Sequence, residues 1–114
     1  MHDEIYSGDV ERWLQDGASL VDVREPWEYE SGHLPGATNI PMGEVIARLD
    51  EIVDPVVLVC ATGNRSGRVA EYLMKNGHSR VANLLGGTVA WIEQGFEVET
   101  GAPTEDDRES GDGA

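Results

Sequence analysis

The sequence predicts an α/β fold: a three-layer sandwich in which a central, mostly parallel sheet of about five strands is flanked by helices. Strand-like runs alternate with helical patterns along the chain, as they do in proteins built on a parallel sheet. The run Val56–Val59 is apolar throughout, as expected for a strand buried on both faces of such a sheet. With 114 residues, the chain is long enough for one hydrophobic core and too short for two.

The first half of the chain reads as strand, helix, strand, helix. We expect a short strand at Glu4–Tyr6. Ser7 offers an N-cap for a helix that Gly17 closes, because the apolar residues between them follow helical spacing. The next strand is expected at Ser19–Val23, and a brief helix over Pro26–Tyr29, since proline suits the first turn of a helix.

In the second half, residues 32–41 form an irregular segment whose prolines and glycines fix the course of the backbone. A helix follows with Val45, Ile46 and Leu49 facing inward. Beyond the strand Val56–Val59, the expected elements are a helix from Ser66 closed by Gly77, a strand at Val81–Leu84, a helix through Ala90–Ile92 closed by Gly95, and an extended edge at Phe96–Val98.

The end of the chain differs in composition from the rest. Residues 101–114 read GAPTEDDRESGDGA, which is polar and acidic with no apolar anchor. Such a segment cannot bury enough apolar surface to offset the entropy lost on ordering. We therefore expect one domain over residues 1–100, followed by an acidic, disordered tail over residues 101–114.

The net charge of the chain limits the kinds of molecule that it can bind. Acidic residues outnumber basic ones by 22 to 8, the formal net charge is −14, and Lys75 is the only lysine. We expect no nucleic-acid partner, because binding nucleic acid requires a basic surface. An acidic surface with almost no lysine resembles halophilic proteins, which work at an ionic strength that screens charges over a few ångströms. The alternative is an ordinary acidic domain with a solvated face.

Cysteine usage and hydropathy indicate the compartment. The single cysteine, Cys60, excludes an internal disulfide, and with three scattered histidines it offers no ligand set spaced for a metal such as zinc. No apolar stretch approaches the roughly 20 residues that span a membrane, and no signal peptide opens the chain. We therefore expect a cytoplasmic protein that contacts no membrane.

Cys60 is the centre of the predicted site. It follows the strand Val56–Val59, and open α/β sheets place their ligands at the carboxyl ends of strands. A loop of small residues leads from it into the next helix, and Gly63 lets the backbone curl back. The amides of residues 61–66, the helix dipole and Arg65 would each favour the thiolate, the nucleophilic form of cysteine. This pattern predicts a reactive site for a small oxyanion or a charged sulfur adduct. The alternative is a buried structural cysteine.

Three blocks of sequence, in order along the chain, carry a family resemblance. They are DVREPWEYESGHLPGATNIP at 22–41, CATGNRS at 60–66 and LLGGTVAW at 84–91. The first is similar to the amino-terminal signature of the rhodanese family, the second to its active-site pattern Cys-x-x-Gly-x-Arg-Ser, and the third to the Gly-Gly and Trp near its carboxyl end. From about Ile5 to Phe96, the chain resembles the small single-domain members of that family.

The resemblance implies a rhodanese-like fold and a rhodanese-type (thiosulfate) sulfurtransferase that works through a cysteine persulfide. Cys60 would take a sulfane sulfur from a donor, such as thiosulfate or a persulfide. It would then pass this sulfur to a thiophilic acceptor: a thiol, cyanide or a protein. The residue types support the same chemistry, because a thiolate attacks the donor, sulfite leaves and the loop amides hold the charge. No metal and no organic cofactor is needed.

On this interpretation Cys60 and Arg65 are the catalytic residues. Ser66 is expected to open the helix, and its hydroxyl is a candidate hydrogen-bond donor to the sulfur. The predicted substrate-binding residues are those of the loop and one arginine from a neighbouring strand end: Ala61, Thr62, Gly63, Asn64, Ser66 and Arg24.

Three further residues are expected to support the site structurally. Asp22, at the end of the strand before Arg24, would buttress the loop or line the rim of the pocket. Glu28 is expected to form an ion pair with Arg24. His33 is expected to fix the Pro/Gly-rich segment by hydrogen bonds.

Two other functions fit the same residues. A phosphatase or arsenate reductase also flanks an anion-holding loop with cysteine and arginine, but phosphatases of the related fold carry a loop longer by one residue. The four residues here, Ala61 to Asn64, make a smaller cradle that suits a sulfur adduct better than a phosphate ester. The other function is a relay or docking module that gives a persulfide only to a protein partner. The intact Cys60 and Arg65 argue against an inactive module, but they leave such a relay open.

Overall fold

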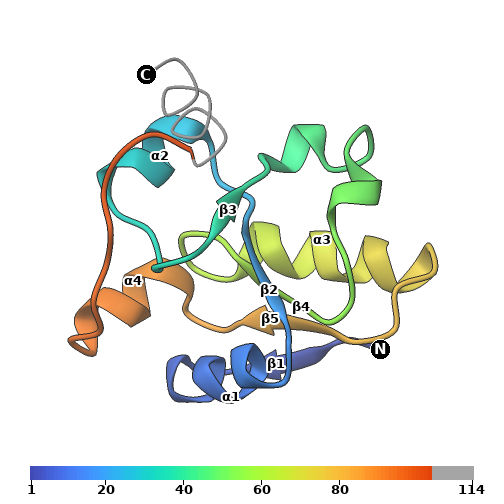
Figure 1. The fold of residues 1–114 in the computed structure, drawn as a ribbon, viewed down its shortest axis with the longest axis horizontal. Coiled ribbons are helices and arrows are strands. Elements are labelled where there is room, and N and C mark those ends of the chain that lie inside the picture. The colour runs from blue at the N-terminus through green and yellow to red at the C-terminus, as the bar shows by residue number, and fades with distance from the viewer. Residues whose placement is uncertain (104–114) are drawn as a thin grey trace.

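A computed structural model describes residues 1–103 of the chain, and its core is a single five-stranded sheet (Figure 1). All four pairs of neighbouring strands are parallel, and their order across the sheet is β1-β5-β4-β2-β3. The strands are β1 (Asp3–Ile5), β2 (Ser19–Asp22), β3 (Thr38–Asn39), β4 (Val56–Val59) and β5 (Val81–Leu84). The predicted α/β sandwich is confirmed.

Helices connect the strands, as parallel pairing requires. They are α1 (Val10–Gln15), α2 (Pro26–Ser31), α3 (Asn64–Lys75) and α4 (Gly87–Glu93), together with the 3-10 turns η1 (Ser7–Asp9), η2 (Met42–Glu44) and η3 (Leu49–Glu51). Among the helices within residues 1–103, none has the length and apolar character that crossing a bilayer would demand.

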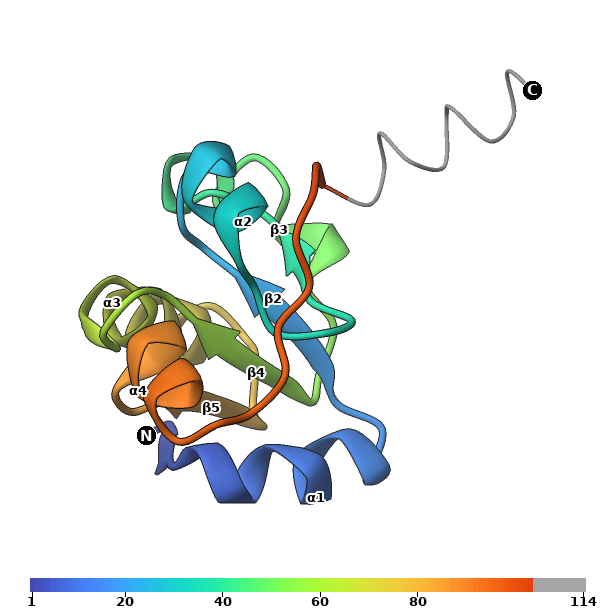
Figure 2. The ribbon, with the colours of Figure 1, turned by 90° about the vertical axis from the view of Figure 1, so that its left-hand side faces the viewer.

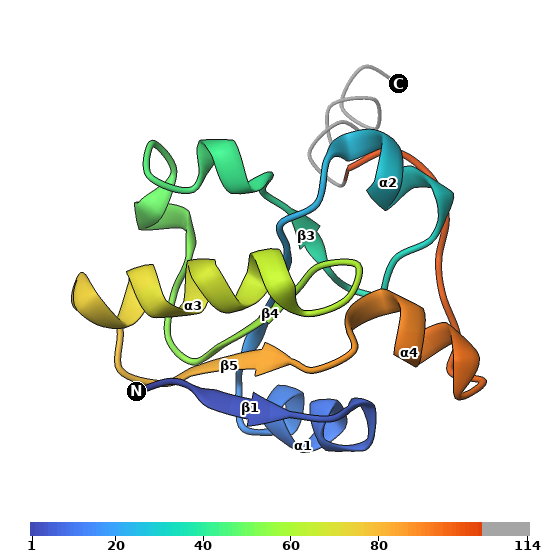
Figure 3. The ribbon, with the colours of Figure 1, turned by 180° about the vertical axis from the view of Figure 1, so that it is seen from behind.

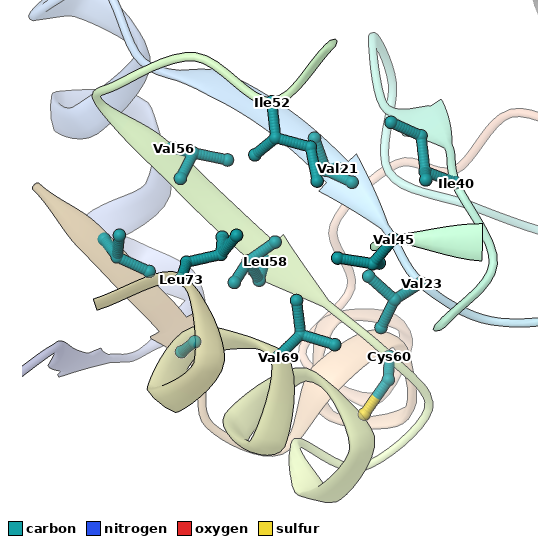
Figure 4. Close-up of a cluster of buried hydrophobic side chains, with 12 residues drawn as sticks. Val21, Val23, Ile40, Val45, Ile52, Val56, Leu58, Cys60, Val69 and Leu73 are labelled. Atoms are coloured by element: carbon teal, nitrogen blue, oxygen red, sulfur yellow. The ribbon is translucent and has the colours of Figure 1, made fainter. Parts of the chain in front are cut away.

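The three layers follow from the alternation of side chains along β4. Val56 and Leu58 point into a cluster that is closed by Val69 and Leu73 of α3, as Figure 4 shows. The intervening valines of β4 point into a second cluster on the other face, where α1, α2 and α4 contribute Val10, Trp13, Tyr29 and Trp91. Figure 3 shows α3 and α1 on opposite sides of the sheet. Both faces of β4 are therefore buried, as its unbroken apolar sequence predicts.

The register of the strands brings two polar residues, Asp22 and Asn83, to the carboxyl end of the sheet. Asp22 lies opposite Val59, and Asn83 lies opposite Leu58. The carboxyl ends of β2, β4 and β5 are thus level, which places Asp22 and Asn83 within a residue or two of Cys60. This is the sheet edge at which parallel α/β proteins bind ligands.

The first predicted helix has a different start. Ser7 is not its N-cap, because it lies buried within η1. Tyr6 is the N-cap of η1, where its N–H donates to the Asp9 carboxylate at 2.9 Å, and Asp9 is the N-cap of α1. The side chain of an aspartate three residues further along can accept a hydrogen bond from this N–H. The prediction of Ser7 as the cap did not consider this arrangement.

The segment before β4 also departs from expectation. In place of one helix with Val45, Ile46 and Leu49 inward, the chain forms η2, turns and η3, and Ile46 is 69% exposed. Val45 is buried and Leu49 packs against the core, so only part of the predicted apolar face exists. The predicted irregular segment 32–41 contains β3, which at two residues is too short to produce a periodic signal.

After α4 the chain runs back past the end of the sheet toward α2 (Figure 2). The predicted extended edge at Phe96–Val98 forms no ladder; one residue further, Glu99 makes a single antiparallel bridge with His33. The N–H of Gly101 donates to the carbonyl of Glu30 at 3.0 Å. The rest of the expected tail, residues 104–114, lies outside the described residues.

Candidate active site

The backbone of Cys60 is held in place by hydrogen bonds from the start of α4. The carbonyl of Cys60 accepts hydrogen bonds from the N–H of Thr88 at 2.9 Å and from its hydroxyl at 3.1 Å. Gly87 makes this approach feasible: a Cβ there would lie 2.4 Å from the Cys60 carbonyl oxygen, and its φ is +55°. Gly87, the second glycine of the pair after β5, therefore lets the start of α4 approach the cysteine.

The sulfur of Cys60 points toward the first turn of α3 and away from the aliphatic side chains of the core (Figure 4). The N–H of Gly63 donates to Sγ at 3.1 Å, and the hydroxyl of Ser66 lies 3.3 Å from it. The loop thus brings hydrogen-bond donors around the sulfur, which is the arrangement that stabilises a thiolate. The alternative of a sulfur packed only among aliphatic groups is excluded by these contacts.

Electrostatics at the sulfur follow from these donors. Burial by itself raises the pKa of the Cys60 thiol. The hydrogen bonds of the Ser66 hydroxyl and of the amides of Ser66, Gly63 and Thr62 act in the opposite direction and prevail, so the pKa of the thiol lies below its ordinary value. The site therefore favours the nucleophilic form of cysteine.

The helix after the loop begins earlier than predicted. It starts at Asn64, with Gly63 as its N-cap at a φ of +102°, so Ser66 does not open it but lies within its first turn. A Cβ on Gly63 would meet the carbonyl oxygen of Leu84 at 3.2 Å. The left-handed conformation of Gly63 lets α3 begin directly after the loop, and it makes the expected contact between Ser66 and Sγ geometrically available.

Arg65 does not fold over the sulfur. Its guanidinium donates two hydrogen bonds to the Glu28 carboxylate, at 2.8 and 2.9 Å. Hydrogen bonding to Arg65 holds the pKa of Glu28 at about 2, and the same contact raises the pKa of Arg65, to which the negative charge of Cys60 also contributes. The guanidinium therefore supplies positive charge near the thiol while its hydrogen bonds go to α2.

The expected Arg24–Glu28 ion pair is wrong. Arg24 binds Asp22 instead, through Nε at 3.0 Å and through a terminal nitrogen at 2.9 Å, and it also donates to the carbonyl of Gly32 at 2.8 Å. Both members of the pair are buried, Asp22 at 0% and Arg24 at 6% exposure. Two residues apart, they satisfy each other locally, so Glu28 is left for Arg65. The buried guanidinium faces the protein and is not placed on the rim predicted for substrate binding.

His33 lies at the end of α2. Its Nδ1 is 2.7 Å from the carbonyl oxygen of Tyr29, and its ring stacks on that of Tyr29 with centroids 3.6 Å apart. Its backbone exchanges two hydrogen bonds with Glu99. The remaining predicted site residues, Ala61, Thr62 and Asn64, lie in the loop between β4 and α3 or at the first position of α3.

Sequence reasoning missed two residues that contact this site, Asn83 and Thr88. Asn83 is buried on β5, where its side chain meets the hydroxyl of Ser66 and the carbonyl of Gly63. The available signal was a polar residue inside an otherwise apolar strand, because buried polar side chains require partners. Among residues 1–103, no group of three or more His, Cys, Asp or Glu side chains is arranged to hold a metal ion.

The fold and the site define a class: an α/β protein with a free cysteine beside a loop of hydrogen-bond donors at the carboxyl end of a parallel strand. Residues 7–94 match the model of the rhodanese-like domain. The chain belongs to the rhodanese-like family. The match spans most of the described chain, from η1 to the end of α4.

Three relatives show how the chain compares in sequence. It is 38% identical over 102 residues to a sulfurtransferase of Allochromatium vinosum, covering 86% of this chain and 95% of that protein. It is 49% identical over 76 residues to the uncharacterized protein YqhL of Bacillus subtilis, covering 65% of this chain and 60% of YqhL. The putative sulfur carrier protein YrkF of the same organism is 39% identical over 75 residues, or 64% of this chain and 40% of YrkF.

Among solved structures, a rhodanese-related protein from Thermoplasma volcanium superimposes with a TM-score of 0.78 at 30% identity. The alignment covers 87% of this chain and 99% of that protein. The fold is therefore shared over nearly the whole of that chain.

Proposed function

We propose that this protein is a sulfurtransferase that carries a sulfane sulfur as a persulfide on Cys60. Membership of the rhodanese-like family and similarity to a sulfurtransferase support a role in sulfur transfer. The observation that carries the mechanism is the position of Sγ. A free thiol lies at the carboxyl end of β4, 3.1 Å from the N–H of Gly63 and 3.3 Å from the hydroxyl of Ser66.

In the first step the Cys60 thiolate attacks the outer sulfur of thiosulfate. A bond forms between Sγ and that sulfur, the S–S bond of the donor breaks, and its electron pair leaves on sulfite. With a persulfide donor, the leaving group is a thiolate in place of sulfite. The N–H groups of the loop stabilise the charge on the incoming donor and on the persulfide that remains.

In the second step a nucleophile attacks the outer sulfur of the persulfide. A thiol or cyanide takes up that sulfur, and the electron pair of the broken S–S bond returns to Cys60 as thiolate. The depressed pKa of the thiol helps both steps, since it favours the attacking thiolate and makes Cys60 a good leaving group. Neither step calls for a metal or an organic cofactor.

Arg65 supplies the positive charge for this site. Its side chain is one-third exposed, and its pair with Glu28 places the guanidinium beside the loop. An anionic donor would compete with Glu28 for those two N–H groups, whereas a neutral or protein-bound persulfide would not. Arg24, buried on Asp22, contributes to the frame of the site and not to donor binding.

The test is a two-stage assay on the purified protein. Incubation with thiosulfate followed by intact-mass spectrometry should show one added sulfur atom, and Cys60 is the only cysteine that can carry it. Addition of cyanide should then release thiocyanate with repeated turnover. Hydrolysis of a phosphate ester with no sulfur loading would instead point to a phosphatase.

A persulfide relay to a protein acceptor is the second candidate. The observation that favours it is the similarity of this chain to a putative sulfur carrier protein. Such a relay would load one sulfur and turn over cyanide slowly or not at all. Loading without thiocyanate release would therefore favour the relay.

The setting we propose is a reducing cytoplasm of high ionic strength. A single unpaired cysteine suits a compartment in which thiols stay reduced. The net charge of −14 with one lysine suits a medium that screens acidic repulsion.

A further inference from the structure

Asn83 is a polar side chain in the interior of the sheet, on β5 between β1 and β4. Only 3% of it is exposed, and its amide makes three hydrogen bonds. Its nitrogen donates to the carbonyl of Gly63 at 3.1 Å and to the carboxylate of Glu4 at 2.9 Å, and its oxygen accepts from the hydroxyl of Ser66 at 2.5 Å. Asn83 thus touches Gly63 and Ser66, two of the residues whose groups approach the sulfur.

The orientation of the amide follows from these partners. A backbone carbonyl and a carboxylate only accept hydrogen bonds, so the nitrogen of Asn83 must face Gly63 and Glu4. Its oxygen is thereby fixed toward Ser66. The Ser66 hydroxyl has a single proton and two acceptors within reach, the Asn83 oxygen at 2.5 Å and Cys60 Sγ at 3.3 Å.

We propose that Asn83 is a positioning residue whose amide oxygen holds the Ser66 hydroxyl proton while Cys60 is a thiol and yields it to the sulfur when Cys60 becomes a thiolate or a persulfide. The hydroxyl reorients in this step and keeps its proton. The proton that Cys60 loses passes to solvent. In this ionisation the S–H bond of Cys60 breaks and a water molecule takes up the proton; no other covalent bond of the protein changes.

The relative strength of the two acceptors drives the reorientation. A neutral thiol accepts weakly, so in that state the short contact to Asn83 prevails. A thiolate is an ionised acceptor, and a charge-assisted hydrogen bond is roughly twice as strong as a neutral one. When the hydroxyl turns to the sulfur, the buried Asn83 oxygen loses its partner, and that loss opposes ionisation. Asn83 therefore limits how far the loop lowers the pKa of the Cys60 thiol.

The charged groups around the sulfur come from the neighbouring elements. They are Arg65 of α3 with its partner Glu28 of α2, the Asp22–Arg24 pair at the end of β2, and Glu4 of β1 beyond Asn83. Substitutions at Asn83 and Ser66 leave all of these charges in place. A change in thiol acidity in those variants then reports on the hydrogen bonds and not on a lost charge.

The experiment is a thiol titration in four proteins: wild type, Asn83→Ala, Ser66→Ala and the double variant. Thiolate absorbance in the ultraviolet gives the midpoint directly, because Cys60 is the only cysteine. Asn83 also anchors Gly63, so the informative quantity is the effect of Asn83→Ala with Ser66 present minus its effect with Ser66 absent. We expect this difference to be a fall of about half a pH unit, the size of one neutral hydrogen bond.

An equal effect of Asn83→Ala in both backgrounds, or a rise specific to Ser66, overturns the proposal. Asn83→Val, which suits a buried strand, replaces the alanine variant if that variant does not fold. Glu4→Ala is the control, taken in the same two Ser66 backgrounds so that the effect of its lost charge cancels. Gly63 still orients the amide, so the difference between the two backgrounds should stay within about 0.2 units. A difference as large as that of Asn83→Ala would show that the outer contact is responsible and contradict the proposal.

The proposal rests on the proposed function only in taking Cys60 as the reacting group. The titration uses no sulfur donor, so it succeeds or fails independently of turnover. A protein that shows the expected midpoints but neither loads sulfur nor forms thiocyanate would refute the sulfurtransferase and leave the role of Asn83 intact.

Discussion

The guanidinium of Arg65 and the carboxylate of Glu28 form a two-point ion pair, with N–O distances of 2.8 and 2.9 Å. The pair joins the first turn of α3, the helix that follows β4, to α2, the helix that follows β2. It thus ties the positive charge near Cys60 to a helix far away in sequence. Arg65 therefore places a positive charge near Cys60 and also connects α3 to α2 through its ion pair with Glu28.

The Glu28→Gln variant tests the ion pair between Glu28 and Arg65 through the pH dependence of the unfolding free energy. The pKa of Glu28 is lowered from 4.5 to about 2 in the folded protein, so its contribution to stability is complete above the unfolded pKa and is lost as pH falls toward 2. We expect wild type to be more stable than the variant by about 1 kcal/mol at neutral pH, since the pair is only partly buried. The difference should shrink between about pH 4.5 and pH 2. Paired urea titrations across that range measure it, and a gap that does not depend on pH would contradict the ion pair.

Cys60→Ser tests the nucleophile. A hydroxyl keeps the size and the hydrogen-bonding partners of the thiol but forms no persulfide, so sulfur transfer should be abolished. The fold should persist, with a change in melting temperature of a few degrees, roughly 1 kcal/mol for a domain of this size. Intact-mass spectrometry after thiosulfate, together with thiocyanate release, provides the measurement. Residual transfer at the wild-type rate would rule out Cys60 as the sulfur carrier.

Arg65→Lys tests the planar guanidinium. Lysine keeps the charge, but it donates from a single point and cannot span both oxygens of a carboxylate or a sulfonate group. We expect kcat/KM for thiosulfate to fall about tenfold, which corresponds to roughly 1.4 kcal/mol of lost transition-state binding. Steady-state thiocyanate formation gives the value. Kinetics equal to those of wild type would show that Arg65 takes no part in donor binding and has only the structural role of pairing with Glu28.

The fold was predictable where local patterns were strong. The strands at 56–59 and 81–84 are short runs whose boundaries match the structure, because a buried strand needs only apolar residues between turn signals. The segment that became η2 and η3 carries three apolar residues at helical spacing, and its tertiary setting buries only part of them. β3 has two residues and exists only because it pairs with β2.

The contacts within the loop could be predicted from the sequence, but the contacts between the loop and other elements could not. Cys60, Gly63 and Ser66 lie within seven consecutive residues, so their proximity follows from the sequence itself. The choice of Glu28 as the partner of Arg65 depends on where α2 lies relative to α3, which no local pattern encodes. Asn83 was missed for the same reason: it reaches Ser66 only through the register of β5 beside β4.

Gly87→Ala tests the close approach of α4 to the cysteine. A methyl group there would lie 2.4 Å from the Cys60 carbonyl oxygen and 2.6 Å from the carbonyl carbon of Ala61, and all of these are backbone atoms. Because the backbone φ of +55° adds strain, we expect a loss of about 2–4 kcal/mol in unfolding free energy and slower sulfur loading. Gly8→Ala is the matched control, since nothing lies within 4 Å of its new methyl group. Equal stability of the two variants would contradict the packing described at Cys60.

The net charge of −14 leads to a final prediction on salt. Acidic residues that repel one another destabilise the folded chain, and this repulsion weakens as the Debye length falls from about 10 Å at 0.1 M salt to about 3 Å at 1 M. We expect the melting temperature to rise by at least about 5 °C between dilute and molar potassium chloride, which is on the order of 1 kcal/mol for a domain of this size. Sodium chloride at equal ionic strength should give the same rise if screening is the cause, whereas specific cation binding would separate the two salts. A melting temperature that stays flat in both salts would mean that the acidic surface is no adaptation to salt.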